Sequence, residues 1–198
     1  MTRFLPRRWR KLLSPLPELE TERLLMRPVT LEDARDMFDY SRNPRTSEYL
    51  LWEPHQTIDF TVSHIRHLLS QYKAVSYFDW ALVDKSSGRM IGTAGFTRLS
   101  GLYGTGELGY VLSPAYHRRG LAPEAVKTVM AFGFEKLELN SLFCRIMEGN
   151  IPSRKVAERL GFVFLGFERE PIQKRDARQR IARYQLTRDA YLQQNRTV

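Results

Sequence analysis

The sequence predicts an α+β fold: a single domain with one mixed central sheet of about seven strands and about four flanking helices. Three runs with strand character (76–83, 89–99 and 107–112) are separated only by short turns, which predicts an antiparallel meander. Apolar residues at helical spacing precede and follow this meander. The 198 residues, 42% of them hydrophobic, suffice for one buried core. The predicted order is β-α-α-β-β-β-α-β-α-β-β.

Composition narrows the class of protein. No apolar run approaches the roughly 20 residues that cross a bilayer, so we expect no membrane segment. We expect no secretory signal, because its apolar core would be interrupted by Arg7, Arg8, Arg10 and Lys11. Cys144 is the only cysteine, which rules out an internal disulfide and suits a reducing cytosol, so we expect a cytoplasmic protein. The net charge of +9 favours an anionic partner.

We expect three segments: a basic N-terminal arm at 1–17, the folded domain at 18–190 and a C-terminal tail at 191–198. The arm has five basic residues, three prolines and no acid, so we expect it to be loosely ordered. In an alternative interpretation, Trp9 and the leucines after it dock on the domain or on a partner. In another, the arm contacts a ribosome or another polyanion.

The domain begins with a predicted strand over 19–29. Thr30 and Asp33 then have the spacing of a capping box, which predicts the start of a helix that runs to about Ser41. A second helix is predicted over 57–72.

An irregular segment at 44–56 separates these helices and holds Trp52. Aromatic side chains in a loop either line a substrate cleft or pack as a satellite of the core, and both interpretations stay open here. His64 and His67 lie three residues apart on the second helix. They have no third ligand in view, so we expect no metal site.

The second half of the chain alternates helices and strands. After the meander the pattern predicts a helix to about Leu137, a strand over 142–147, a helix over 151–160 and a strand over 162–167. A basic connection at 168–180 then leads to a strand over 180–186, which we expect to close the sheet.

The central feature is the stretch 107–125, where a strand runs through a basic loop into a helix. Pro123 and Glu124 suit the first turn of a helix. The loop His117-Arg118-Arg119-Gly120-Leu121-Ala122 contains one glycine, which permits close approach of the backbone to a ligand. Free N–H groups at a helix start bind anions, so the stretch predicts an anion site. It matches neither the Walker loop nor the dinucleotide fingerprint.

This stretch resembles the GNAT family of acetyl-CoA-dependent N-acetyltransferases. The family signature Gln/Arg-x-x-Gly-x-Gly/Ala is matched at Gly120 and Ala122 and departs at His117. The resemblance implies that acetyl-CoA is the acetyl donor and that no metal is needed. It implies cofactor contacts from the strand end and the loop, namely Tyr110, Val111, Leu112, His117, Arg118, Arg119, Gly120, Leu121 and Ala122.

A second match lies downstream, in Asn150-x-x-Ser153 and the following Val156-Ala157-x-x-Leu160-Gly161-Phe162. The resemblance implies that Asn150 binds the pantetheine and that Ser153 lies near the sulfur of CoA. Alternatively, Asn150 caps a helix and Ser153 sits in its first turn, and both interpretations are compatible.

Residues 19–190 more narrowly resemble the branch that acetylates the N-termini of ribosomal proteins, the RimJ/RimL type. The matching features are Leu19-Glu20-Thr21-Glu22-Arg23-Leu24, Trp52-Glu53-Pro54-His55, Gly109-Tyr110 and Gly161-Phe162 with Gly166. The segment 168–180 departs: the family pattern leads us to expect an aspartate near 180, and the chain has Arg175, Arg178 and Arg180.

Direct transfer of an acetyl group to an amine needs a base, an oxyanion donor and an acid. The resemblance makes Glu107 the base, acting through water, although a surface charge at a strand end is the alternative. A backbone N–H near Tyr110–Val111 would stabilise the oxyanion. Ser153 would give a proton to the thiolate, while Trp52 and Tyr110 would contact the acceptor.

The predicted function is transfer of acetyl from acetyl-CoA to a primary amine, foremost the N-terminal α-amine of a ribosomal protein or peptide. One alternative is a small-molecule amine acetyltransferase of the same fold. Another is a catalytically silent, basic protein that binds nucleic acid or ribosomes through the segments 1–13 and 168–188. We expect a monomer or homodimer.

Overall fold

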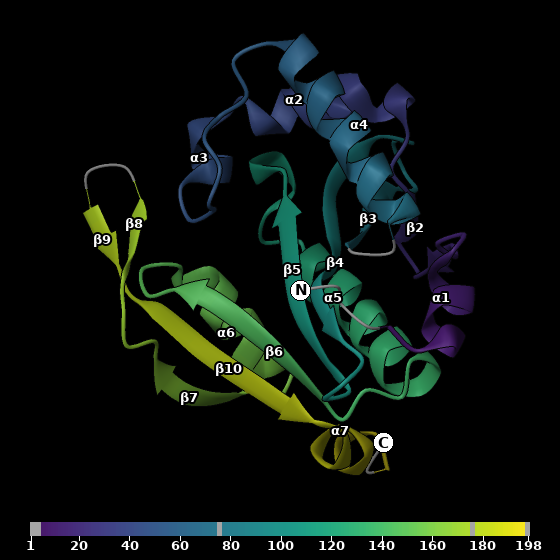
Figure 1. The fold of residues 1–198 in the computed structure, drawn as a ribbon. Coiled ribbons are helices and arrows are strands. Elements are labelled where there is room, and N and C mark those ends of the chain that lie inside the picture. Colours follow the sequence, from purple (N-terminus) through teal and green to yellow (C-terminus); the bar gives the residue numbers. More distant parts are fainter. Residues whose placement is uncertain (1–4, 75–76, 175–176, 197–198) are drawn as a thin grey trace.

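An eight-stranded sheet forms the centre of the fold (Figure 1). The computed structural model describes residues 5–74, 77–174 and 177–196. Ser76, the first residue of the strand predicted over 76–83, lies outside these ranges. The strands lie in the order β1-β2-β3-β4-β5-β6-β10-β7, and only β5 and β6 are parallel. Their bounds are β1 Leu19–Glu20, β2 Leu24–Pro28, β3 Phe78–Asp84, β4 Met90–Ser100, β5 Thr105–Leu112, β6 Ser141–Met147, β7 Val163–Phe167 and β10 Ile181–Thr187.

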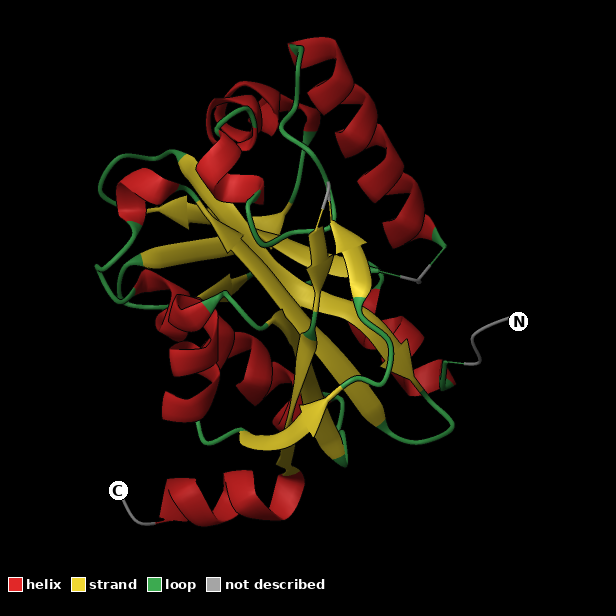
Figure 2. Cartoon of the chain, turned by 90° about the vertical axis from the view of Figure 1, so that its left-hand side faces the viewer, coloured by secondary structure: helices red, strands yellow, loops and turns green. Residues whose placement is uncertain are grey.

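Helices cover both faces of this sheet (Figure 2). The described part of the chain has the helices α1 Arg7–Leu13, α2 Ala34–Ser41, α3 Pro44–Ser47, α4 Ile58–Lys73, α5 Leu121–Ala131, α6 Ile151–Arg159 and α7 Arg188–Arg196. Apolar residues of α2 and α4 form one core cluster on one face, and those of α1, α5, α6 and α7 join the larger cluster on the other. The predicted α+β fold is confirmed, and α2, α4, α5 and α6 are the four expected helices.

The single strand predicted over 19–29 is a hairpin of β1 and β2. Thr21 causes the turn, because its Oγ1 accepts hydrogen bonds from the backbone N–H of Leu24 at 2.8 Å and of Arg23 at 3.3 Å. The predicted capping box follows directly. Thr30 N–H donates to Asp33 Oδ2 at 2.7 Å at the start of the 3-10 turn (Leu31–Asp33) that leads into α2.

The parallel strands β5 and β6 separate part-way along their length. Their register runs from Thr105 opposite Ser141 to Leu108 opposite Cys144, whereas β5 stays paired with β4 as far as Leu112. Figure 1 shows β5 and β6 leaving a common base and diverging. One backbone edge of residues 109–112 therefore faces a gap in the sheet.

The expectation that the strand over 180–186 closes the sheet is wrong, because β10 lies between β6 and β7 and β7 forms the edge. Ile181 lies opposite Met147, while Ala182 lies opposite Phe167, so β10 uses both of its edges. The basic connection at 168–180 forms a separate hairpin of β8 (Ile172–Lys174) and β9 (Ala177–Gln179), and Arg175 lies outside the described residues.

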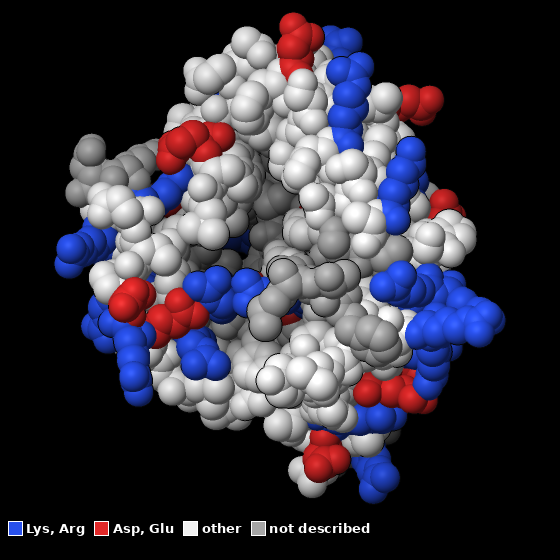
Figure 3. Space-filling model, viewed as in Figure 1, with Lys and Arg blue, Asp and Glu red and all other residues white. Residues whose placement is uncertain are grey.

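The N-terminal segment is not loosely ordered over its described residues. In α1, Trp9 and Leu13 are buried in the larger core cluster, and Trp9 Nε1 donates to the carbonyl of Leu137 at 2.7 Å. The apolar face of the segment therefore outweighs its charge. Its basic side chains point outward, and Figure 3 shows Lys and Arg gathered on the side where α1 lies. No helix of the described ranges is both long and apolar enough to cross a membrane.

The segment expected as a C-terminal tail also packs on the domain, as part of α7. Tyr191 is buried, stacks on Phe134 with ring centroids 4.6 Å apart, and donates from its hydroxyl to Glu135 at 2.6 Å. Residues 197–198 lie outside the described part of the chain.

We predict that Trp9→Ala lowers the free energy of unfolding by about 3–5 kcal/mol, because it removes a buried aromatic side chain and leaves a cavity. Urea denaturation followed by circular dichroism measures the loss. Arg10→Ala in the same helix is the control and should change stability by less than about 0.5 kcal/mol, since Arg10 is exposed. Equal effects of the two substitutions would contradict the docking of α1.

Candidate active site

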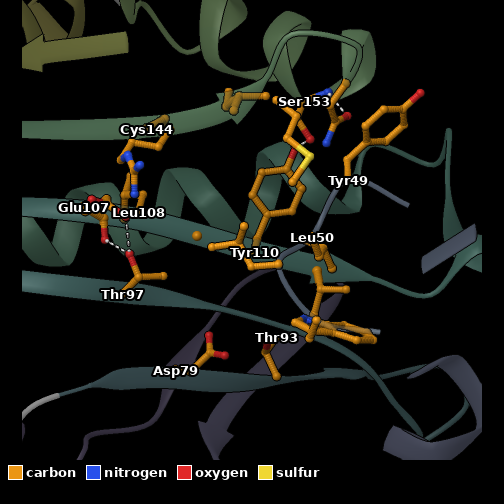
Figure 4. A pocket seen from close by; sticks show the side chains of 18 of the residues that line it. Tyr49, Leu50, Asp79, Thr93, Thr97, Glu107, Leu108, Tyr110, Cys144 and Ser153 are labelled. Carbon is orange, nitrogen blue, oxygen red and sulfur yellow. Dashed lines mark hydrogen bonds between the residues drawn. The ribbon is translucent and has the colours of Figure 1, made fainter. Parts of the chain in front are cut away.

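A cavity of about 330 Å³ opens where β5 and β6 separate. One half is lined from α2, α4, the 49–55 segment and strands β3 and β4. The other half is lined from β6 and α6, with β5 between them. Figure 3 shows the hollow in the surface, and Figure 4 shows Glu107, Tyr110, Ser153 and Asp79 around the cavity. The predicted residues Glu107, Tyr110, Val111, Asn150, Ser153 and Trp52 all line it.

Glu107 is held by a residue of the neighbouring strand. A register shift in β4 between Phe96 and Arg98 brings Thr97 beside Glu107, and Thr97 Oγ1 donates to Glu107 Oε1 at 2.9 Å (Figure 4). Glu107 is half-buried and lines the cavity, so it is not the surface charge of the alternative interpretation.

Cys144 lies across from Leu108 in the last parallel pair of β5 and β6. Burial raises the pKa of its thiol to about 12, with the nearby Glu107 carboxylate adding to the rise. The thiol is therefore neutral near pH 7 and is a poor nucleophile. This agrees with direct transfer, which needs no protein nucleophile.

Tyr110 and Ser153 form a hydrogen-bonded pair across the gap. Tyr110 Oη donates to Ser153 Oγ at 3.0 Å, and burial raises the pKa of Tyr110 to about 12, which keeps its hydroxyl protonated. Asn150 caps α6, since its Oδ1 accepts from Ser153 N–H at 3.2 Å. The capping role is confirmed. Asn150 also lines the cavity.

The loop after β5 has the backbone that the anion site requires. Arg118 and Gly120 have φ of 60° and 76°, and α5 begins at Leu121 directly after Gly120. The residue that departed from the signature, His117, holds the loop: its Nε2 lies 2.9 Å from the carbonyl oxygen of Leu112, at the end of β5. The hydrogen bond ties the loop to the end of β5, directly before the first turn of α5.

A set of hydrogen bonds that the sequence analysis did not predict holds the start of α5. Glu124 accepts from the backbone N–H of Arg23 at 3.1 Å and from its Nε at 2.7 Å, and also from the Thr21 hydroxyl. Arg23 Nη1 donates to the carbonyl of Arg119 at 2.7 Å. The turn of the β1–β2 hairpin therefore binds both the loop and the helix start. Only the fold brings these two segments together.

The loop with Trp52 lines the cavity, so the cleft-wall interpretation describes its position. Trp52 lies against His55, with ring centroids 5.3 Å apart. Lys174 of β8 is buried and donates from Nζ to the Trp52 carbonyl at 2.9 Å and to Glu53 Oε1 at 2.5 Å. The β8–β9 hairpin thus holds this loop over the cavity.

Asp79 is a cavity residue that the sequence analysis missed. It lies in β3, is only 7% exposed, and accepts hydrogen bonds from the hydroxyls of Tyr77 (3.2 Å) and Thr93. Burial raises the pKa of its carboxyl to about 7, against the two hydroxyls, which lower it. The available signal was an acid inside an otherwise apolar strand, Phe78-Asp79-Trp80-Ala81-Leu82-Val83.

The residues that the structure describes contain no group of three potential metal ligands. His55 and His64 lie close together, with centroids 5.4 Å apart, and burial lowers the pKa of both, that of His55 to about 4. They are neutral near pH 7.

Comparison with known proteins identifies the family. The model of the acetyltransferase (GNAT) domain matches residues 23–163. The chain belongs to the GNAT acetyltransferase family. The p20 protein of Bacillus licheniformis, named as an N-acetyltransferase, is 32% identical over 77% of the chain and 85% of its own length. YoaA of Bacillus subtilis, also named so, is 29% identical over 74% and 82%. Spermidine N(1)-acetyltransferase of Escherichia coli is 24% identical over 69% and 71%.

Solved GNAT structures share the fold. One is RimL, a ribosomal L7/L12 alpha-N-protein acetyltransferase in complex with coenzyme A, with a TM-score of 0.79 at 14% identity over 88% of this chain and 99% of that one. Another is the microcin C7 self-immunity acetyltransferase MccE with acetyl-CoA and AMP, with a TM-score of 0.77 at 15% identity over 84% and 93%. The GNAT chain described here is therefore an acetyl-CoA-dependent N-acetyltransferase.

The raised pKa of Asp79 in this GNAT enzyme predicts a pH-dependent stability. Its usual pKa is near 3.8 and its folded value is about 7, so the folded state retains the proton that the unfolded state loses. The stability from this group is complete below about pH 4 and is lost as the pH rises to about 7. We predict that the free energy of unfolding of Asp79→Asn, measured relative to that of the wild type, increases by about 1–3 kcal/mol from pH 5 to pH 8. Urea denaturation at both pH values measures it, and parallel pH profiles of the two proteins would contradict it.

Proposed function

We propose that this acetyltransferase moves the acetyl group of acetyl-CoA directly onto a primary amine held between β5 and β6. The observation that carries the proposal is the convergence of Glu107 with the Tyr110–Ser153 pair on one cavity beside the separated edge of β5. A carboxylate that accepts a proton and a hydroxyl pair that gives one are what aminolysis of a thioester needs.

The residues around the gap fit the donor. The backbone edge of Tyr110, Val111 and Leu112 is free of β6 and can pair with the amides of the pantetheine arm. The positive φ at Arg118 and Gly120 and the start of α5 direct backbone N–H groups toward a pyrophosphate, and Arg118 and Arg119 add positive charge. Acetyl-CoA supplies the acetyl group as an activated thioester.

Residues of the chain then remove a proton from the amine and donate one to the sulfur. Glu107 takes a proton from the incoming ammonium group, directly or through water, so that the nitrogen can attack the carbonyl carbon. A backbone N–H of β5 near Tyr110–Val111 donates to the carbonyl oxygen as it gains negative charge. Ser153 gives its proton to the departing sulfur. Tyr110, whose hydroxyl already donates to Ser153, passes a proton to Ser153 and takes one from solvent, so both hydroxyls are restored.

The acceptor class has two candidates, each with its own support. An N-terminal α-amine of a ribosomal protein or peptide is supported by the sequence resemblance and by the shared fold of RimL. A small-molecule amine is supported by the similarity to a spermidine acetyltransferase and by the loop at Trp52, which Lys174 holds over the cavity. A catalytically silent protein would not need a half-buried glutamate such as Glu107 at the cavity, so this residue counts against that alternative.

We predict that the protein binds acetyl-CoA with a Kd in the micromolar range by calorimetry. It should also release free CoA when offered an acceptor from a panel of N-terminal peptides, aminoglycosides and polyamines. Thiol release measured with a chromogenic reagent identifies the acceptor class. Binding of RNA with steep salt dependence but without acetyl-CoA binding would instead support the silent alternative.

We predict that Glu107→Gln lowers kcat about 10²–10⁴-fold and abolishes the rise of rate with pH on the acid side of the profile, because the amide cannot accept the proton. Glu138→Gln is the matched control and should leave turnover unchanged, since Glu138 pairs with Arg8 at the surface.

Ser153→Ala separates the two proton steps. It should lower kcat while keeping the acid-side pH dependence, because the base remains in place. A Glu107→Gln profile that retains the wild-type pH dependence would show that another group is the base.

A further inference from the structure

We propose that Asp79 forms a second carboxylate site for the acceptor, which binds the distal ammonium group of an acceptor with two amino groups while the reacting amine faces Glu107. This inference rests on the proposed function, because it assigns the acceptor half of the same cavity.

Strand register places the two carboxylates on one face of the sheet. Asp79 lies opposite Gly95 on β4, and Gly95 lies opposite Gly109 on β5, two residues beyond Glu107. Residues that face each other, or that lie two apart on a strand, point to the same side. Standard strand spacing gives about 12 Å between the Cα atoms of Asp79 and Glu107. A short linear diamine can therefore span from one carboxylate to the other.

The floor between the carboxylates carries no side chain. Gly95 must be glycine, because a Cβ there would lie 1.9 Å from the carbonyl oxygen of Phe78. A Cβ on Gly109, which lines the cavity, would meet Thr97 Cγ2 at 2.6 Å. Protein atoms already fill the places that these Cβ atoms would take, so the chain of a diamine would lie in the cavity that Asp79, Glu107 and Gly109 line together.

Asp79 lacks a cation. Its partners are the hydroxyls of Tyr77 and Thr93, and no ion pair within the described ranges involves it. Tyr72 of α4 donates to its backbone carbonyl, and Tyr40 of α2 lies close enough to feel its charge. These groups are uncharged, since burial raises the pKa of both tyrosines far above 7.

The cavity wall also carries His55, His64 of α4 and Arg145 of β6. Burial lowers the pKa of both histidines, which keeps them neutral, and Arg145 already pairs with Glu168. A buried carboxylate without a counter-charge is costly, and a ligand ammonium would supply that charge. If Asp79 only accepted the two hydroxyl hydrogen bonds, an asparagine oxygen would serve equally well. The charge itself is what a dicationic acceptor would use.

Proton linkage follows from this arrangement. Near pH 7 the Asp79 carboxyl is partly protonated, and an ammonium group beside it favours the ionised form. Binding of a diamine should therefore release a proton and should tighten as the pH rises from 6 to 8. A monoamine, whose single ammonium faces Glu107, should show neither effect at Asp79.

The test compares 1,4-diaminobutane with n-butylamine, which has the same chain and one ammonium group fewer. Calorimetry on the full-length protein saturated with CoA should show at least tenfold tighter binding of the diamine. Asp79→Asn should abolish this preference. Asp39→Asn makes the same charge change at an exposed acid and should preserve it, since Asp39 pairs with Arg89 at the surface.

A second readout requires no variant. Calorimetry of the wild type at pH 7 in two buffers of different ionisation enthalpy should detect proton release with the diamine and none with n-butylamine. Equal affinity for the two ligands, the absence of diamine-specific proton release, or a preference that survives in Asp79→Asn would each overturn the proposal. Failure of acetyl transfer to every amine of the panel would instead overturn the proposed function, because both readouts here measure binding alone.

Discussion

The separation of β5 from β6 after Leu108 is the constraint on which the site depends. Buried backbone N–H and C=O groups need partners, and a strand that leaves its neighbour exposes one edge that something else must satisfy. Here β5 remains paired with β4 to Leu112, while its other edge opens onto the cavity. The same opening lets Tyr110 reach Ser153 on α6.

Two contacts keep the open end in shape. His117 ties the loop to the carbonyl of Leu112, and Glu124 with Arg23 ties the start of α5 to the β1–β2 hairpin. Gly120 can then adopt its positive φ at the point where strand, loop and helix meet. The substitution of the usual Gln or Arg by histidine therefore preserves the loop by a bond within the chain. In this way a departure from the family signature is consistent with an intact anion site.

The features predicted well from sequence were those with local causes. The capping box at Thr30 and Asp33, the glycine at 120 and the cap at Asn150 each act within a few residues, and the structure has all three. Features that depend on distant segments were not predictable. The insertion of β10 between β6 and β7 leaves no local pattern. The docking of Trp9 was one alternative in the sequence analysis, but its partner, the carbonyl of Leu137, lies 128 residues away. Asp79 was missed for the same reason, since only the register of three strands places it on the floor of the cavity.

Net charge proves a poor guide to the charge of the cleft. A chain of net charge +9 suggests a preference for anions, and that charge counts mildly against a cationic acceptor. The basic side chains of α1 point outward, whereas the cavity is lined by Glu107 and Asp79 and by Arg145 of β6, which pairs with Glu168. Because the field in a low-dielectric cleft is set mainly by groups that lie within it, these residues weigh more there than the distant, screened arginines of the surface. The groups that line the cavity, rather than the net charge of +9, therefore set the field that a bound molecule meets there.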